Sequence, residues 1–211
     1  MEFLLFGLRS LHAETTLRNN LLVGSLLCGC EAVTIEEPVG EPRTLMEMKA
    51  IEGNWIGREG DPMKLVVVSE EDIRMGTMSW DSERKRFVAR TDQFQLRHVG
   101  KMDFSFYQFP NQTNPRFLLA RIQMRTDGSL MCQGPEVKLV IEAIRTGKLT
   151  GVLEKNEKMN DIHPHLKCSG DELAKWIEET GEDVVFPKVE DESELIFTKA
   201  EKPERKAPDK K

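Results

Sequence analysis

Short runs of strand-like sequence dominate the chain between residues 53 and 132, and this pattern is the strongest constraint on its fold. Runs rich in β-branched, aromatic or alternating apolar residues predict strands, and the Gly, Asp and Asn residues between them predict turns. The clearest turn is Thr-Asp-Gly-Ser at 126–129, which predicts a hairpin. The predicted strands cover residues 55–57, 64–68, 73–80, 86–90, 94–98, 104–109, 117–124 and 130–132.

Three other segments predict helices. Thr44 and Glu47 have the spacing of a capping box, before a short helix that ends at Gly53. Residues 135–147 carry apolar residues at helical spacing, with Pro at the start and Gly at the end. The clearest helix is capped by Ser169 and ends at Gly181, and its apolar stripe is Leu173, Trp176 and Ile177. Further strands are predicted at 149–153, near residue 162 and at 194–198.

These patterns divide the chain into four parts. Residues 1–29 predict a leader. Residues 30–43 are acidic and interrupted by Pro and Gly, which predicts a flexible tether that reaches about 45 Å when extended. Residues 44–200 predict one β-rich globular domain, and residues 201–211 predict a disordered charged tail because they contain no large apolar residue.

The order of elements predicts a mainly β fold with two or three short helices, arranged as a single antiparallel β-barrel or sandwich. Gly53-Asn54-Trp55 resembles the Gly-x-Trp motif with which the lipocalins and their calycin relatives open. In those barrels a short helix precedes the motif, and another helix packs outside before the last strand. The resemblance implies that Trp55 closes the barrel floor, with Lys199 at the place of the family's Arg partner. The alternative is that Trp55 is a core residue of some other β domain.

The leader centres on the apolar run Leu21–Leu27, with Arg18 just before it. This run is too short to span a bilayer, which takes about 20 residues, but it suits the apolar part of a secretory signal. Leu27-Cys28-Gly29-Cys30 resembles the bacterial lipobox, which ends in Leu, a small residue, Gly or Ala, and Cys. The resemblance implies cleavage before Cys30, acylation of Cys30, and an exported protein anchored by lipid to a bacterial cell membrane. A plain signal peptide, an uncleaved anchor and a cytosolic helix are the alternatives.

The charge balance bears on partners. A net charge of −6 argues against a nucleic-acid partner, which needs clustered Lys and Arg. It also argues against electrostatic attachment to a membrane, so the lipid is the expected anchor. No cofactor is expected.

Cysteine and histidine residues give one candidate pair and one candidate metal site. Cys132 and Cys168 remain after export and form either a disulfide or two buried thiols. His163, His165 and Cys168 are weak candidates for metal ligands, because residues two apart on a strand share a face. The alternative is a polar loop kinked by Pro164, and we expect no metal there.

Three functions are open at this point. The first is a non-catalytic binding or interaction module at a membrane surface, whose barrel takes a small apolar ligand. The second is a structural or assembly subunit of an envelope complex, with a filled barrel. The third is a metal-dependent enzyme that uses the His163 region. We expect no enzyme, because phosphate-binding, nucleophile-elbow and zinc-protease motifs are missing from the sequence. Four aromatic residues are candidates for a cavity lining or for the core: Phe104, Phe106, Tyr107 and Phe109.

Overall fold

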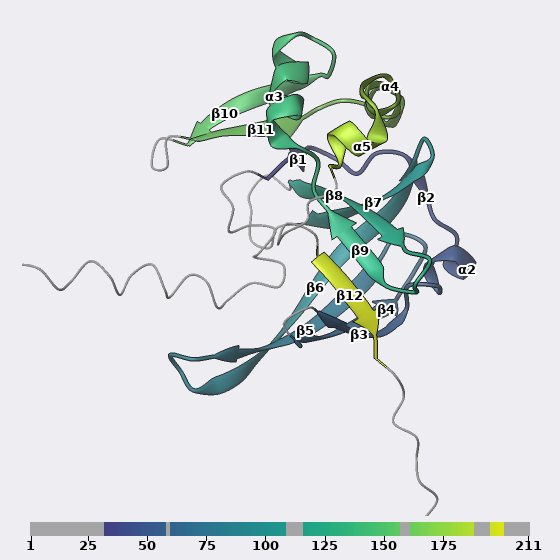
Figure 1. The fold of residues 1–211 in the computed structure, drawn as a ribbon, viewed down its shortest axis with the longest axis vertical. Coiled ribbons are helices and arrows are strands. Elements are labelled where there is room, and N and C mark those ends of the chain that lie inside the picture. Colours follow the sequence, from purple (N-terminus) through teal and green to yellow (C-terminus); the bar gives the residue numbers. More distant parts are fainter. Residues whose placement is uncertain (1–31, 58–59, 109–115, 157–160, 188–194, 201–211) are drawn as a thin grey trace, which may run out of the picture.

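The structure is a computed structural model that describes residues 32–57, 60–108, 116–156, 161–187 and 195–200. The predicted leader 1–29, Cys30 and the predicted tail 201–211 lie outside these residues. In chain order (Figure 1) the described elements are β1 (Thr34–Ile35), β2 (Glu41–Pro42), α2 (Leu45–Met48), β3 (Gly53–Gly57), β4 (Pro62–Val67), β5 (Ile73–Asp81), β6 (Arg86–Val99), β7 (Met102–Gln108), β8 (Phe117–Met124), β9 (Leu130–Gln133), α3 (Val137–Arg145), β10 (Gly151–Asn156), β11 (Asp161–Leu166), α4 (Gly170–Thr180), α5 (Glu182–Val185) and β12 (Leu195–Lys199).

Eight antiparallel strands close into a barrel. Their order around the barrel is β8-β7-β6-β5-β4-β3-β12-β9, and β9 pairs with β8 to close the ring. Strands β3 to β9 follow one another in sequence, and β12 returns at the end of the chain to join β9 to β3. The predicted fold class is therefore confirmed: the chain is mainly β and its barrel is consistent with a calycin-like one.

Strand β8 pairs with β1 near its start and with β9 near its end, and the pairing with β1 begins a second layer outside the barrel. The first residues of β8 pair with β1, whereas Arg121–Met124 pair with β9. Strand β1 also pairs in parallel with β11, so β10 and β11 extend the sheet away from the barrel. Helices α3, α4 and α5 lie on the same side of the barrel as this extension (Figure 1).

The prediction of a flexible tether over residues 30–43 is wrong for most of its length. Val33 and Ile35 are buried, β1 pairs with two strands, and β2 pairs with β6. These strands have only two residues each, so they carry no periodic pattern. The segment is therefore held in place by pairing with distant strands, which its acidic, Pro-containing composition did not predict.

Two hydrophobic cores result, one on each side of β7 and β8. The barrel core lies inside the ring and contains Met48, Ile51, Trp55, Met63, Leu65, Ile73, Phe94, Leu96, Ile122, Leu130 and Phe197. The outer core lies between the barrel wall and the helical layer, and its largest members include Phe104, Phe106, Leu173, Trp176, Ile177 and Phe186.

The helices predicted from local signals are present. Thr44 and Glu47 form the reciprocal capping box of α2. α3 lies inside the segment predicted for it, and α4 buries the predicted stripe. At the start of α4, the Ser169 hydroxyl accepts a hydrogen bond from the backbone N–H of Glu172. The Glu172 carboxylate accepts from the backbone N–H of Thr150 at 2.5 Å. Helix α5 was not predicted, and the two strands predicted at 86–90 and 94–98 are one strand, β6.

Within the described part of the chain, the helices are all too short or too polar to cross a bilayer.

Candidate functional site

One end of the barrel is closed by Trp55 and α2. The Trp55 side chain is 1 % exposed, and its indole Nε1 donates to the carbonyl of Ile51 at 2.9 Å. The Lys199 ammonium lies 5.6 Å from the centre of the indole ring, which is within cation–π range. Gly53 has φ +146°, a conformation that favours glycine. Trp55 is therefore buried at this end of the barrel, with Lys199 beside its ring.

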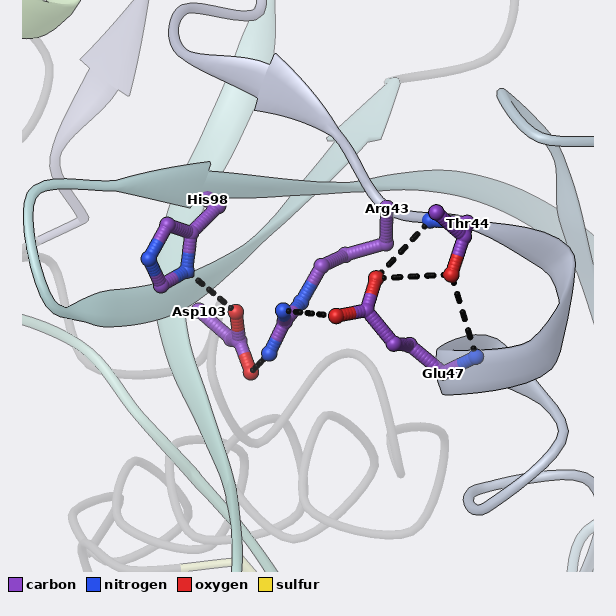
Figure 2. Close-up of polar contacts among 5 residues, drawn as sticks. All are labelled: Arg43, Thr44, Glu47, His98 and Asp103. Atoms are coloured by element: carbon purple, nitrogen blue, oxygen red, sulfur yellow. Dashed lines mark hydrogen bonds and ion pairs between the residues drawn. The ribbon is translucent and has the colours of Figure 1, made fainter.

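A polar cluster fastens the segment before α2 to this closed end (Figure 2). Asp103 lies between Arg43 and His98: one of its oxygens is 2.5 Å from an Arg43 nitrogen and the other is 3.0 Å from Nδ1 of His98. Arg43 also reaches the Glu47 carboxylate at 2.9 Å, and Glu47 accepts from the backbone and hydroxyl of Thr44. These hydrogen bonds lower the pKa of Glu47. Each charge has a partner within the cluster, so we assign it a structural role.

A cavity occupies the other half of the barrel. Its volume is about 620 Å³ when the space at its open mouth is included. Leu195 and Leu118 lie near the starts of β12 and β8, and Tyr107 near the end of β7, so the cavity lies toward the end opposite α2. Its lining is Met63, Leu65, Met75, Phe94, Ser105, Tyr107, Leu118, Ala120, Ile122, Leu130, Cys132, Leu195 and Phe197.

Side-chain size on β7 and β8 explains why space remains there. Successive residues of a strand point to opposite faces. On β7 the aromatic Phe104 and Phe106 point to the outer core, and the small Ser105 points inward. On β8, Leu119 points outward and Ala120 points inward. Small residues thus face the cavity from two adjacent strands.

The polar groups of the lining are neutral and mostly engaged within the protein. The Ser105 hydroxyl donates to the Ala120 carbonyl at 3.2 Å. Burial raises the pKa of Cys132 to about 11, so the thiol is neutral. The Tyr107 hydroxyl donates to Asp92 at 2.9 Å, and burial followed by this hydrogen bond raises its pKa far above the usual range. The cavity therefore offers mainly apolar contact.

Of the three described aromatic residues among the four that the sequence singled out, only Tyr107 lines the cavity. Phe104 and Phe106 are fully buried in the outer core, and Phe109 lies outside the described residues. The sequence analysis missed Ser105 and Ala120. Their signal was a small residue between bulky ones, in Phe104-Ser105-Phe106 and after Leu118-Leu119.

The two cysteines of the domain are free thiols in different cores. Cys132 faces the barrel cavity, whereas Cys168 is buried in the outer core. Burial raises the pKa of Cys168 to about 12. The disulfide that the sequence left open is therefore not formed, because the barrel wall stands between the two residues.

The histidines of β11 are placed by pairing with neighbouring strands. His163 is opposite Glu154 and His165 is opposite Val152. His165 is 5 % exposed, and its Nδ1 lies 3.0 Å from the Thr34 hydroxyl of β1. Burial, aided by nearby Arg116, lowers the pKa of His165. Among the described residues, His, Cys, Asp and Glu side chains form no group of three that could hold a metal, and His163, His165 and Cys168 are not brought into one site.

In comparisons with protein-family models, curated proteins and solved structures, no match was found. The fold and the cavity together define the chain as a closed antiparallel β-barrel with an apolar interior cavity.

Proposed function

We propose that this chain is a non-catalytic binding module that takes a small apolar ligand into its barrel at a bacterial membrane surface. The observation that carries the proposal is the apolar cavity at the end opposite α2. Met, Leu, Ile and Phe side chains form most of its lining, and a predominantly apolar lining with a few polar groups is typical of small-molecule sites.

The lining favours an uncharged ligand. Transfer of an unpaired charge into apolar surroundings carries a large free-energy cost. The cavity's own polar groups are neutral, and those of Ser105 and Tyr107 already donate to protein acceptors. An apolar chain or ring that displaces water from Met, Leu and Phe side chains would gain roughly 25 cal/mol for each Å² of apolar surface buried.

The rival hypothesis of an assembly subunit requires a filled barrel that offers only its outer face. The inward-facing Ser105 and Ala120 do not fill the barrel at their level. The cavity therefore favours ligand binding over a purely structural role.

Binding of the apolar fluorophore N-phenyl-1-naphthylamine to the full chain tests the proposal. We expect saturable binding, and we expect Ala120→Leu to weaken it at least tenfold because the added atoms enter the cavity. Gln123→Leu is the matched control: it adds an apolar group on the same strand, but on its exposed outer face. Equal binding by wild type and Ala120→Leu would contradict the proposal.

The lipid anchor is a separate part of the proposal and rests on Leu27-Cys28-Gly29-Cys30. Two or more acyl chains hold a protein stably at a membrane, whereas one holds it only marginally. Val33 is already buried in the outer core, so only three residue steps, roughly 10 Å when extended, would separate Cys30 from the folded domain. The domain would therefore lie against the lipid headgroups.

Metabolic labelling with a fatty acid in bacteria tests the anchor. We expect label in the wild type and none in Cys30→Ser, because the thiol is the acylated group. Cys28→Ser is the control and should keep the label, since serine suits that lipobox position. Equal labelling of Cys30→Ser would remove the anchor and leave the cavity proposal untouched.

A further inference from the structure

A two-stranded hairpin projects from the barrel between residues 78 and 89 (Figure 1). Strand β5 pairs with β4 only as far as Thr77, and β6 pairs with β7 only from Phe94 onward. Within the described part of the chain, residues 78–81 and 86–89 pair with each other and with no third strand, from Met78–Ala89 to Asp81–Arg86. In an up-and-down barrel this turn and α2 lie at opposite ends, so the hairpin projects at the end where the cavity lies.

The hairpin exposes an apolar surface on one face. Met78, Trp80 and Phe87 share this face, and they are 42 %, 48 % and 64 % exposed. Trp80 and Phe87 are directly opposite each other, with ring centres 5.0 Å apart in an edge-to-face arrangement. Such a pair stabilises the hairpin by about 0.5–1.5 kcal/mol. It nevertheless leaves about half of each ring in water, so hairpin stability alone does not explain the exposed area.

The turn of the hairpin is basic in an otherwise acidic chain. Residues 81–90 contain four basic and two acidic residues, whereas the whole chain has a net charge of −6. Asp81 is engaged within the turn: one oxygen accepts from the backbone of Glu83 and Arg84, and the other lies 3.8 Å from the Arg84 guanidinium. Residues 81–86 carry three basic and two acidic side chains, so the turn has a net charge of +1 next to the aromatic face.

We propose that this hairpin is a membrane-contact element that places Trp80 and Phe87 in the interface of a bilayer containing anionic lipids. Tryptophan prefers the membrane–water interface because its ring is apolar and its N–H is polar. Arg84, Lys85 and Arg86 would lie at the level of the phosphate groups, where each basic residue is worth about 1 kcal/mol, or roughly fivefold in partitioning. A flat aromatic face with a basic turn suits a lipid surface, which needs no shaped groove.

This contact does not depend on the lipid at Cys30 or on a ligand in the cavity. It would bring the cavity end of the barrel nearer to the membrane than the end closed by α2.

The test uses the full chain with Cys30→Ser and vesicles of phosphatidylcholine with 30 % phosphatidylglycerol. Trp55 and Trp176 are 1 % and 4 % exposed, so Trp80 is the tryptophan that acrylamide reaches. We expect vesicles to shift the Trp80 emission to the blue and to shield it from acrylamide. Brominated phospholipid should quench it, and Trp80→Phe should abolish these responses.

Two further variants separate hairpin contact from attachment by the apolar leader. Replacing Arg84, Lys85 and Arg86 together by Gln should weaken partitioning by at least tenfold. A reporter at the opposite end, Met46→Trp in the Trp80→Phe background, should remain open to acrylamide, because Met46 is 82 % exposed on α2.

Three results would overturn the proposal. One is a Trp80 that stays accessible to acrylamide when the protein sediments with vesicles. Another is equal quenching of the Met46→Trp reporter by brominated lipid. The third is binding that requires membrane protein in the vesicles, which would assign the hairpin to a protein partner.

Discussion

The barrel core and the outer core share the walls β7 and β8 but receive different side chains from them. The outer core takes Phe104, Phe106 and Leu119, all 2 % exposed or less. The barrel interior receives Ser105, Tyr107 and Ala120 from the same two strands, and these residues line the cavity. Two strands thus contribute bulky side chains to the outer core on one face and line the apolar cavity on the other.

This difference separates a stabilising region from a functional one. The outer core joins four sets of elements across the fold: β1, the barrel wall, the β10–β11 extension and the helices. The buried Arg121 strengthens this junction, since its guanidinium reaches Glu182 at 2.6 Å and Gln133 at 2.8 Å and lies 4.7 Å from the Phe186 ring centre. We infer that the outer core supports a barrel whose own interior is incompletely filled.

The largest expected effect follows from removing a bulky side chain from the outer core. Trp176→Ala should lower the free energy of unfolding by about 3–5 kcal/mol, because it leaves a cavity among well-packed neighbours. Trp80→Ala is the matched control, since Trp80 is 48 % exposed; losing its cross-strand pair should cost at most about 1.5 kcal/mol. Urea unfolding measures both, and equal losses would show that the outer core is not the more demanding region.

Adding side-chain volume to the outer core and to the cavity tests the same difference between a filled region and an incompletely filled one. Ala143 and Ala120 are 3 % and 2 % exposed, the first in the outer core and the second at the cavity. Ala143→Leu should lower the free energy of unfolding by about 1–3 kcal/mol, because extra atoms overpack a filled site. Ala120→Leu should change it by less than about 1 kcal/mol, because it enters empty space. A larger loss at Ala120 in urea unfolding would mean that the cavity is closed in solution.

The parts of the fold that could be predicted from the sequence are those set by local chemistry. The capping residues Thr44 and Ser169 and the turn at 126–129 fix their elements through neighbours only a few residues away. Strand β8 was predicted at its observed bounds because six of its eight residues are apolar and the turn at 126–129 follows it. Trp55, which the calycin resemblance placed at the barrel floor, is buried in the barrel core.

The features that the sequence did not predict depend on distant partners. β1 and β2 exist only because β11, β8 and β6 supply their hydrogen bonds. The cavity depends on which way β7 and β8 face. Alternation divides the residues of each strand into two sets, one for each face of the sheet. Because both faces of β7 and β8 are largely buried, the sequence pattern did not predict which set points into the barrel.

A pH effect is expected at the junction between β1 and β11. Because burial lowers the pKa of His165 below its ordinary value of 6.5, the folded chain binds a proton there less readily than the unfolded chain. Stability from this site is therefore complete above about pH 6.5 and falls as the pH drops toward the folded-state pKa. Urea midpoints at pH 7.5 and 5.5 should differ less in His165→Gln than in wild type. The same pH response in both proteins would contradict this assignment.

The smallest expected effect concerns the closed end of the barrel, where a cation faces an indole ring. Lys199 lies on the last strand opposite Trp55. Lys199→Gln should lower the free energy of unfolding by about 0.5–1 kcal/mol, because the ring loses its cationic partner. Lys199→Arg should retain the stability, since a guanidinium also stacks on an indole. Lys64→Gln, an exposed lysine on the adjacent β4, controls for loss of charge. In a double-mutant cycle with Trp55→Phe, most of the Lys199 effect should disappear, and strictly additive losses would show that the two residues do not interact.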